Sequence, residues 1–171
     1  MTKQEFLVFS LPYKLYVIDD EINETFQVVW YREDSDELLI YDNNDGSIEE
    51  YYENLLKPIL RPLSDLTKEI EHNGEKFIPA LELIKLEEKY NNWKDIAPTI
   101  PYDIKIINKP FGKVLKVSKV EHWVIYLSLN EMERAKYYIV SQLIKWKFDI
   151  ASLIPKGEAI DVNTLEINPY K

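Results

Sequence analysis

The sequence predicts an α+β fold: a small antiparallel β-meander plus a hairpin, packed with two helices over about residues 79–90 and 130–150. Three observations lead to this class. Short early segments are rich in β-branched and aromatic residues, which suit strands. An Asn-Gly pair at 73–74 is the strongest two-residue hairpin signal. Late in the chain, apolar residues recur at steps of three or four, which is helical spacing.

The bulk composition fits one domain over residues 1–171, with a possible division into an acidic β-rich part, 1–55, and an α+β part, 56–171. Cysteine is absent, which excludes disulfides and thiolate metal sites. No apolar run approaches the ~20 residues that span a bilayer, so we expect no membrane partner. The pI near 4.8 argues against direct nucleic-acid binding.

The N-terminal third predicts a meander over about residues 5–52. Its strands are expected at 14–18, 25–31 and 37–42, where β-branched and aromatic residues gather. The Asn-Asn-Asp-Gly run at 43–46 follows the third strand. It predicts a turn, because Asn, Asp and Gly tolerate a positive φ.

Residues 64–74 allow two interpretations. One is a helix that is capped by Ser64 and closed by Gly74. The other is a hairpin with arms at 66–72 and 75–78. The β-branched and aromatic residues of the two arms, together with the Asn-Gly turn between them, favour the hairpin.

The middle of the chain predicts a helix, a loop and two strands. Pro79 suits the first turn of the helix at 79–90. Proline lacks a backbone N–H, and an N–H in the first turn of a helix has no acceptor within the helix. Several prolines and a glycine make residues 91–112 mostly loop. Strands are expected at 113–118 and 122–128.

The second helix is expected over residues 130–150. Asn130 can cap it, since its side-chain oxygen can accept a hydrogen bond from an unpaired amide. An apolar stripe at helical spacing supports the assignment. The stripe consists of Met132, Ala135, Ile139, Leu143, Trp146 and Ile150.

Charge is unevenly placed along the chain. Residues 19–53 hold 13 acidic side chains and one basic side chain, Arg32, whereas residues 104–120 hold five lysines and no acid. The acidic segment could present carboxylates to a basic partner, for example in place of phosphate in a nucleic-acid-binding groove. The lysines could contact phosphates. In the alternative interpretation, acidic turns keep a small sheet soluble and guard its edges.

Candidate partner-binding residues come from both charged segments and from two further positions. Trp93 lies in a polar context and is a candidate anchor, because aromatic residues concentrate binding energy at interfaces. The full set is Asp34, Asp36, Glu37, Asp42, Asp45, Glu49, Glu50, Arg61, Trp93, Lys113, Lys116 and Lys119.

Arg61 lies between Pro58 and Pro62 in an otherwise apolar run. Both prolines restrict the chain to extended conformations, which favours a structural joint between the acidic part and the rest. Arg61 would then pair with a carboxylate such as Asp65, or reach a partner.

No catalytic motif is present. The only histidines, His72 and His122, each follow a glutamate. Neighbouring residues on a strand face opposite sides, so neither pair forms a two-ligand site. We therefore expect no cofactor and no bound metal. A His–carboxylate pair assembled by the fold stays an alternative.

Two stretches, roughly residues 56–80 and 143–170, resemble a group of small uncharacterised phage and prophage proteins of gut-type bacteria. The matching motifs are KPILRPLSDLTKEI and, later, WKFD with LIPKGEAID. In that group a Pro-x-Leu-Arg-Pro-Leu-Ser-Asp core follows a variable β-rich N-terminus, and a Trp-His-Phe-Asp block precedes the tail. This chain has Lys147 where the group usually has His, so no role for that histidine is carried over. The resemblance implies a phage origin without a specific activity.

The expected function is binding, not catalysis. We expect a non-enzymatic phage accessory protein that acts by protein–protein contact in the host cytoplasm. An inhibitor of a host defence or nucleic-acid enzyme would suit the acidic segment. One alternative is a virion structural or assembly component. Another is a small enzyme that uses His72 or His122 with carboxylates.

Overall fold

The computed structural model describes residues 1–19, 21–32, 35, 37–42, 45–91, 102–109, 112–119, 123–128 and 137–171. It is a mixed α+β structure that is richer in strand than in helix, which confirms the predicted class. The chain forms two compact units, Met1–Pro62 with Ile144–Pro169 and Leu63–Leu143 with Tyr170–Lys171. The single domain expected over 1–171 stays a prediction.

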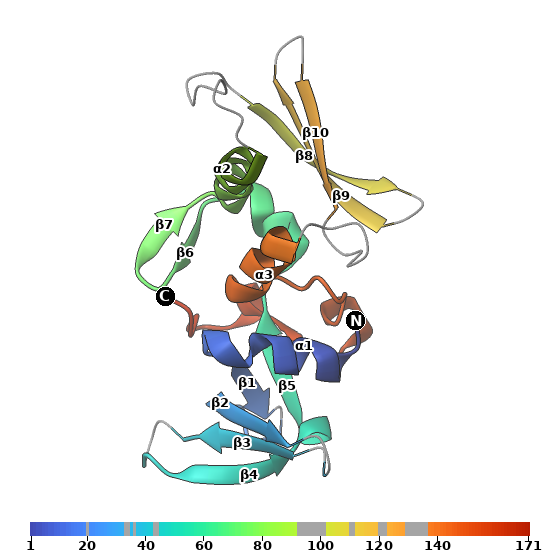
Figure 1. Cartoon of the computed structure of the whole chain (residues 1–171). Helices are drawn as coiled ribbons and strands as arrows, with labels where there is room; N and C mark the ends of the chain where they lie inside the picture. Colours follow the sequence, from blue (N-terminus) through green and yellow to red (C-terminus); the bar gives the residue numbers. More distant parts are fainter. Residues whose placement is uncertain are drawn as a thin grey trace. The chain divides into compact units, whose positions relative to one another are not determined.

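The first unit is built on a six-stranded sheet in the order β11-β5-β1-β2-β3-β4 (Figure 1). Its neighbours are antiparallel except for β11, which pairs with β5 in parallel. The strands are β1 (Tyr16–Asp19), β2 (Glu24–Arg32), β3 (Glu37–Tyr41), β4 (Ile48–Tyr52), β5 (Leu56–Leu60) and β11 (Ile160–Asp161). The three strands of the predicted meander are confirmed as β1, β2 and β3.

A β-bulge divides β2 into two halves. Even-numbered side chains face the core before the bulge, and odd-numbered ones face it after the bulge. The register passes from Val28 opposite Ile40 to Trp30 opposite Leu39, so Val29 is the additional residue. Val28 is buried before the bulge and Tyr31 is buried after it. Since one inserted residue reverses which side chains face the core, Trp30 points outward.

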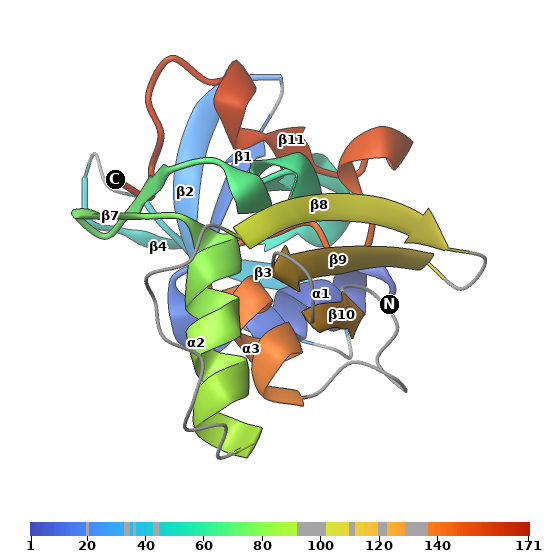
Figure 2. The same ribbon diagram turned by 90° about the horizontal axis from the view of Figure 1, so that it is seen from above.

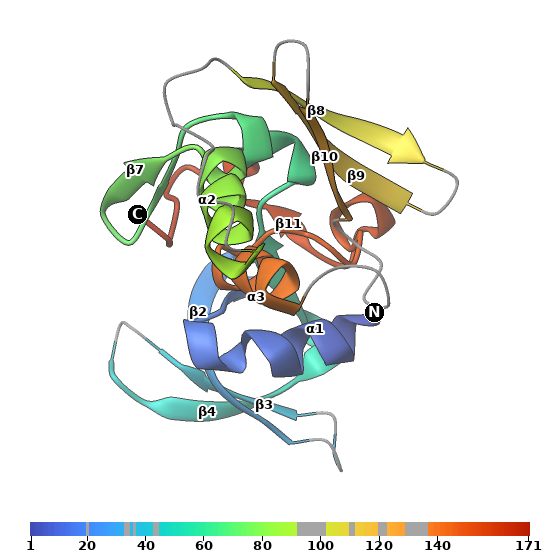
Figure 3. The same cartoon turned by 45° about the horizontal axis from the view of Figure 1, so that its top comes forward.

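A helix that the sequence analysis did not predict begins the chain. α1 (Lys3–Ser10) runs alongside the sheet of its own unit (Figure 1 and Figure 3). Thr2 caps it: the Glu5 amide donates to the Thr2 hydroxyl at 3.1 Å, and the Thr2 amide donates to the Glu5 carboxylate at 2.7 Å. This reciprocal capping box satisfies two amides that a helix N-terminus otherwise leaves unpaired. Phe6 and Leu7 are fully buried.

The second unit begins with a 3-10 turn, η3 (Leu63–Thr67), followed by a hairpin of β6 (Ile70–His72) and β7 (Glu75–Phe77). Asn73 and Gly74 have φ of 53° and 79°. Positive φ at both central positions is what a two-residue hairpin turn of this hand requires. The hairpin is therefore confirmed, with a first arm shorter than expected.

The rest of the second unit holds the predicted helix and a second sheet. α2 (Pro79–Asn91) confirms the helix at 79–90. β8 (Tyr102–Lys109), β9 (Gly112–Lys119) and β10 (Trp123–Ser128) form an antiparallel three-stranded sheet (Figure 2). β9 and β10 confirm the two predicted strands. The loop expected over 91–112 is wrong in its second half, because β8 pairs along its whole length with β9.

The second predicted helix is shorter at its C-terminus than expected. α3 is Tyr137–Lys145, and Lys147 has a φ of 65°, which a right-handed helix cannot contain. The chain leaves the helix because Arg61 pairs in parallel with Phe148. Asn130, Met132 and Ala135 lie outside the described residues.

Apolar side chains form the core of each unit. In the first unit the fully buried ones include Phe6, Leu15, Phe26, Leu38, Ile59 and Phe148. In the second they include Leu66, Leu83 and Leu143. Four further 3-10 turns complete the described secondary structure: η1 (Leu11–Tyr13), η2 (Glu53–Leu55), η4 (Ile154–Lys156) and η5 (Val162–Thr164).

Candidate functional site

The side of the sheet that faces away from the core of the first unit carries the most conspicuous exposed group of side chains. Cross-strand partners lie on the same side of a sheet. Trp30 is opposite Leu39 and Leu39 is opposite Glu50. The same register places five further residues on this side. We call the set the outer face: Trp30, Arg32, Glu37, Tyr41, Ile48, Glu50 and Tyr52.

Large apolar side chains of the outer face are exposed. Trp30, Ile48 and Tyr52 keep 61%, 62% and 61% of their surface in contact with solvent. Isolated exposed apolar residues are normal, but a contiguous group on one sheet face marks an interaction surface more often than chance. β-branched and aromatic residues also suit strands for local reasons, so exposure alone does not identify a partner.

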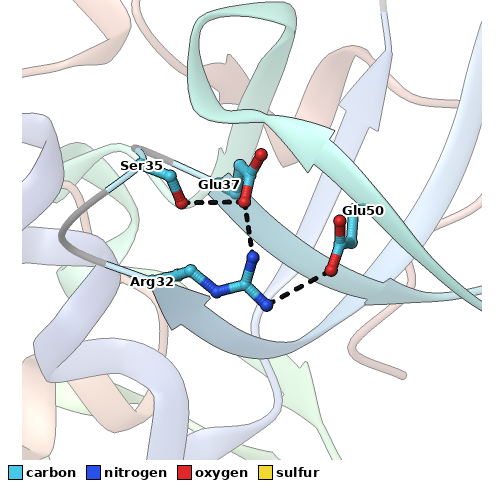
Figure 4. Close-up of polar contacts among 4 residues, drawn as sticks. All are labelled: Arg32, Ser35, Glu37 and Glu50. Atoms are coloured by element: carbon cyan, nitrogen blue, oxygen red, sulfur yellow. Dashed lines mark hydrogen bonds and ion pairs between the residues drawn. The ribbon is translucent and has the colours of Figure 1, made fainter.

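A small ion network crosses the three strands of the outer face (Figure 4). The Arg32 guanidinium lies 2.8 Å from the Glu37 carboxylate and 3.2 Å from that of Glu50. The Ser35 hydroxyl donates to the same Glu37 oxygen at 2.7 Å. The two carboxylates, Glu50 first, raise the pKa of Arg32 above its ordinary value. The one cation of the acidic segment is therefore already occupied by two anions.

The remaining carboxylates of the segment divide into inward and outward groups. Glu53 is buried, where Lys3 Nζ lies 3.5 Å from its carboxylate, and Asp19 accepts a hydrogen bond from the Glu21 amide at 2.9 Å. Glu49 and Asp45 are exposed. The pKa of Tyr51 is raised, first by burial and then by nearby carboxylates with Glu49 foremost. A field of negative charge thus extends over this end of the sheet.

Not all predicted site residues lie in this region. Glu37 and Glu50 belong to the outer face, and Asp42, Asp45 and Glu49 lie on the adjoining β3–β4 turn and edge. Asp34, Asp36 and Trp93 lie outside the described residues. Lys113, Lys116 and Lys119 lie on β9, which belongs to the second unit.

Arg61 is 3% exposed, so its side chain is buried, and its expected contact with a partner stays a prediction. Its backbone amide donates to the Lys147 carbonyl at 2.7 Å, and its carbonyl accepts from the Asp149 amide at 2.8 Å. Asp65 in turn lies 2.6 Å from Lys68 Nζ. The position extends β5 toward the C-terminal segment, so the structural joint is the interpretation that the contacts support.

The motifs of the two resembling stretches meet at this joint. β5 contains Pro58, which lies opposite Val17, and β11 pairs only with Ile59 and Leu60. Proline is tolerated in a strand where one side lacks a ladder partner. The Trp-Lys-Phe-Asp block then pairs with the residue that follows β5. We call the residues Arg61, Lys147 and Asp149 the motif junction.

All three ionisable side chains of the motif junction are buried. The Asp149 carboxylate accepts hydrogen bonds from the amides of Leu153 and Ile154 at 2.7 and 2.9 Å. Lys147 is fully buried, its Nζ lies 5.7 Å from the centre of the Tyr13 ring, and it has no hydrogen-bond partner among the described residues. Burial lowers the pKa of Lys147 to about 7.

Of the two histidines, the structure describes only His72, whose ring contacts an aromatic ring. His72 is buried with its ring 6.0 Å from that of Tyr170, whose carbonyl accepts from the Asn73 amide at 2.8 Å. His122 lies outside the described residues. Within the described ranges no three His, Cys, Asp or Glu side chains gather as a metal site, and none of the helices is long and apolar enough to cross a membrane.

Comparison with known proteins adds no further assignment. No family model, no curated protein and no solved structure matches this sequence. The exposed residues Trp30, Ile48 and Tyr52 were missed from the sequence. The sequence did indicate Ile48 and Tyr52. Each lies two residues from Glu50, and residues two apart in a strand face the same side of the sheet. The sequence did not indicate Trp30, since its outward orientation depends on the bulge.

Proposed function

We propose that this chain is a non-enzymatic phage accessory protein that binds a basic partner protein in the host cell through the outer face. The phage context rests on the resembling motifs, and the binding mode rests on the surface of the sheet. One observation carries the proposal: exposed Trp30, Ile48 and Tyr52 lie among carboxylates, and the Arg32 guanidinium beside them is already paired with Glu37 and Glu50.

Such a surface suits a partner that brings its own cations. Aromatic side chains supply contact area and bind Lys or Arg over their ring faces. Carboxylates supply long-range attraction, which accelerates encounter and disfavours acidic competitors. A basic protein satisfies both groups, including a nucleic-acid enzyme whose binding groove is cationic.

The test uses a pair of variants with equal changes in net charge. Glu50→Lys alters the outer face, whereas Glu166→Lys alters an exposed position in the tail beyond β11, at the opposite end of the strand order. Each tagged protein is used to capture a partner from a host lysate. The partner is purified, and its Kd is measured at about 50 mM and about 300 mM NaCl.

We expect Glu50→Lys to weaken binding about tenfold, and Glu166→Lys to leave it within about twofold of wild type. Higher salt should weaken wild-type binding, because exposed charges are screened. If both variants lost affinity equally, the loss would come from the change in net charge and not from the outer face. A Kd unaffected by salt would contradict the proposal.

A further inference from the structure

β4 is the last strand of the six-stranded sheet. In the part of the chain that the structure describes, β4 pairs with β3 on one side and with no strand on the other. An open strand edge displays backbone N–H and C=O groups that can pair with another chain. What the edge can accept depends on which of these groups point outward and on the side chains around them.

The outward groups follow from the register. The Asp42 amide donates to the Ser47 carbonyl at 3.1 Å, so these opposite residues form a hydrogen-bonded pair at the end of the ladder. In an antiparallel ladder such pairs alternate with pairs whose backbone groups point away from the partner strand. The register of β3 and β4 is regular from Tyr41–Ile48 to Glu37–Tyr52. The backbone groups of Ile48, Glu50 and Tyr52 therefore point to the open edge.

Charge decides between two occupants of that edge. A second copy of this chain would bring its own Glu49 and Glu50 against the same residues, and like charges on adjacent strands destabilise pairing. A cationic strand would place its side chains beside Glu49 on one side of the sheet and Glu50 on the other. The edge is thus guarded against self-association and complementary to Lys and Arg.

We propose that the open edge of β4 docks an extended, cationic segment of the partner protein as an added strand. This inference rests on the proposed function and specifies its binding mode. The backbone groups of Ile48, Glu50 and Tyr52 form the new ladder, and their side chains on the outer face contact those of the segment. Main-chain pairing supplies affinity, and alternating side chains supply specificity.

A matched pair of variants separates backbone pairing from charge. Glu50→Gln and Glu50→Pro remove the same charge, but only proline also removes the outward N–H. Because that N–H does not bond to β3, proline leaves the existing ladder intact. The probe is a capped peptide of alternating Lys and Val. A second probe has the same sequence with alternate backbone nitrogens methylated, which preserves its charge and blocks its donors.

We expect Glu50→Pro to bind the first peptide about fivefold to tenfold more weakly than Glu50→Gln, which corresponds to one lost backbone hydrogen bond. The methylated peptide should bind wild type with a similar loss. Hydrogen exchange should also show that the peptide slows exchange at the amides of Ile48, Glu50 and Tyr52. This last measurement needs no variant, so it decides the matter even if Glu50→Pro does not fold.

Three results would overturn the inference. If the peptide binds in a salt-sensitive way but the two variants and the two peptides behave alike, the docking strand is wrong and the charge-based function stands. If the amides of Ile48, Glu50 and Tyr52 are protected without peptide in a concentration-dependent way, the occupant is a second copy. If the Lys-Val peptide does not bind, a cationic strand is not the ligand of this edge, and capture of a basic partner tests the function separately.

Discussion

The Asp149 amide donates a hydrogen bond to the carbonyl oxygen of Arg61 at 2.8 Å, and this contact joins two motifs that are far apart in the sequence. β11 pairs in parallel with Ile59 and Leu60, and Phe148 pairs in parallel with Arg61, so two C-terminal segments pair with β5 and the residue that follows it. The arginine between two prolines is thus part of a backbone junction. The buried side chains around it make several stability predictions possible.

Asp149 should be the most sensitive polar position of the motif junction. Its carboxylate satisfies two amides, and Asp149→Ala would leave both without an acceptor. We expect the free energy of unfolding to fall by about 2–4 kcal/mol, since each unsatisfied buried group costs about 1–3 kcal/mol. Chemical denaturation measures the loss.

Asp161 provides the control for that prediction. Its carboxylate accepts one hydrogen bond, from the Asn163 amide at 2.9 Å, in an exposed turn. Asp161→Ala should cost about 0.5–1 kcal/mol, as for an ordinary capping residue. Equal costs at the two positions would show that the Asp149 contacts carry no special weight.

Lys147 should make stability depend on pH. The unfolded chain holds this lysine with a pKa near 10.5, whereas the folded chain holds it with a pKa of about 7. Between those values the unfolded state binds more protons, so the free energy of unfolding rises as the pH rises from about 7 toward 10.5. Below pH 7 the full cost of burying the charge remains.

Lys147→Met should remove that rise and increase the free energy of unfolding at pH 7 by about 1–3 kcal/mol, because an apolar side chain replaces an unpaired buried amine. Urea titrations across the pH range measure both effects. Lys145→Met, at the exposed end of α3, should retain the wild-type pH dependence. Parallel pH profiles for wild type and Lys147→Met would contradict the assignment.

Gly74 should be required because its backbone is left-handed, and not because a larger side chain would clash with a neighbour. A Cβ built at Gly74 meets no heavy atom within 4 Å, but φ is 79°. Gly74→Ala should therefore destabilise the protein by about 1–2 kcal/mol through the left-handed conformation alone. Gly74→Asn should cost less, because Asn tolerates that region. Equal losses measured by thermal unfolding would point to a different cause.

Many elements of this fold can be predicted from short stretches of sequence, because the preferences of those residues agree with the tertiary packing. Strand composition, the Asn-Gly turn and Pro79 identify β1 to β3, the hairpin and α2. Helix α1 was missed although its signal is local: Thr2 and Glu5 have capping-box spacing ahead of the apolar Phe6 and Leu7.

Other features depend on pairing and are invisible in single-sequence patterns. Prolines around β8 predicted a loop, but a neighbouring strand stabilises an extended segment between them. The stripe of the second helix continues through Trp146 and Ile150, yet pairing with Arg61 ends the helix first. The bulge at Val29 is the same kind of effect, and it determines which face displays Trp30.

Arg32 should tune binding with little effect on the fold. It is exposed and sits between two carboxylates, so Arg32→Gln frees negative charge on the outer face. We expect the Lys-Val peptide to bind about twofold to threefold more tightly, with a steeper salt dependence and little change in unfolding temperature. Arg32→Lys keeps the charge and should leave the affinity unchanged. Weaker binding by Arg32→Gln would argue that the guanidinium itself contacts the ligand.

The most direct test of the binding surface is NMR of the 15N-labelled protein during titration with the Lys-Val peptide. At about 50 mM NaCl, we predict amide shift changes concentrated in residues 30–52, strongest along β4, that diminish at about 300 mM NaCl. Shift changes centred on β8 to β10 or on the motif junction, or changes that salt does not reduce, would contradict the account.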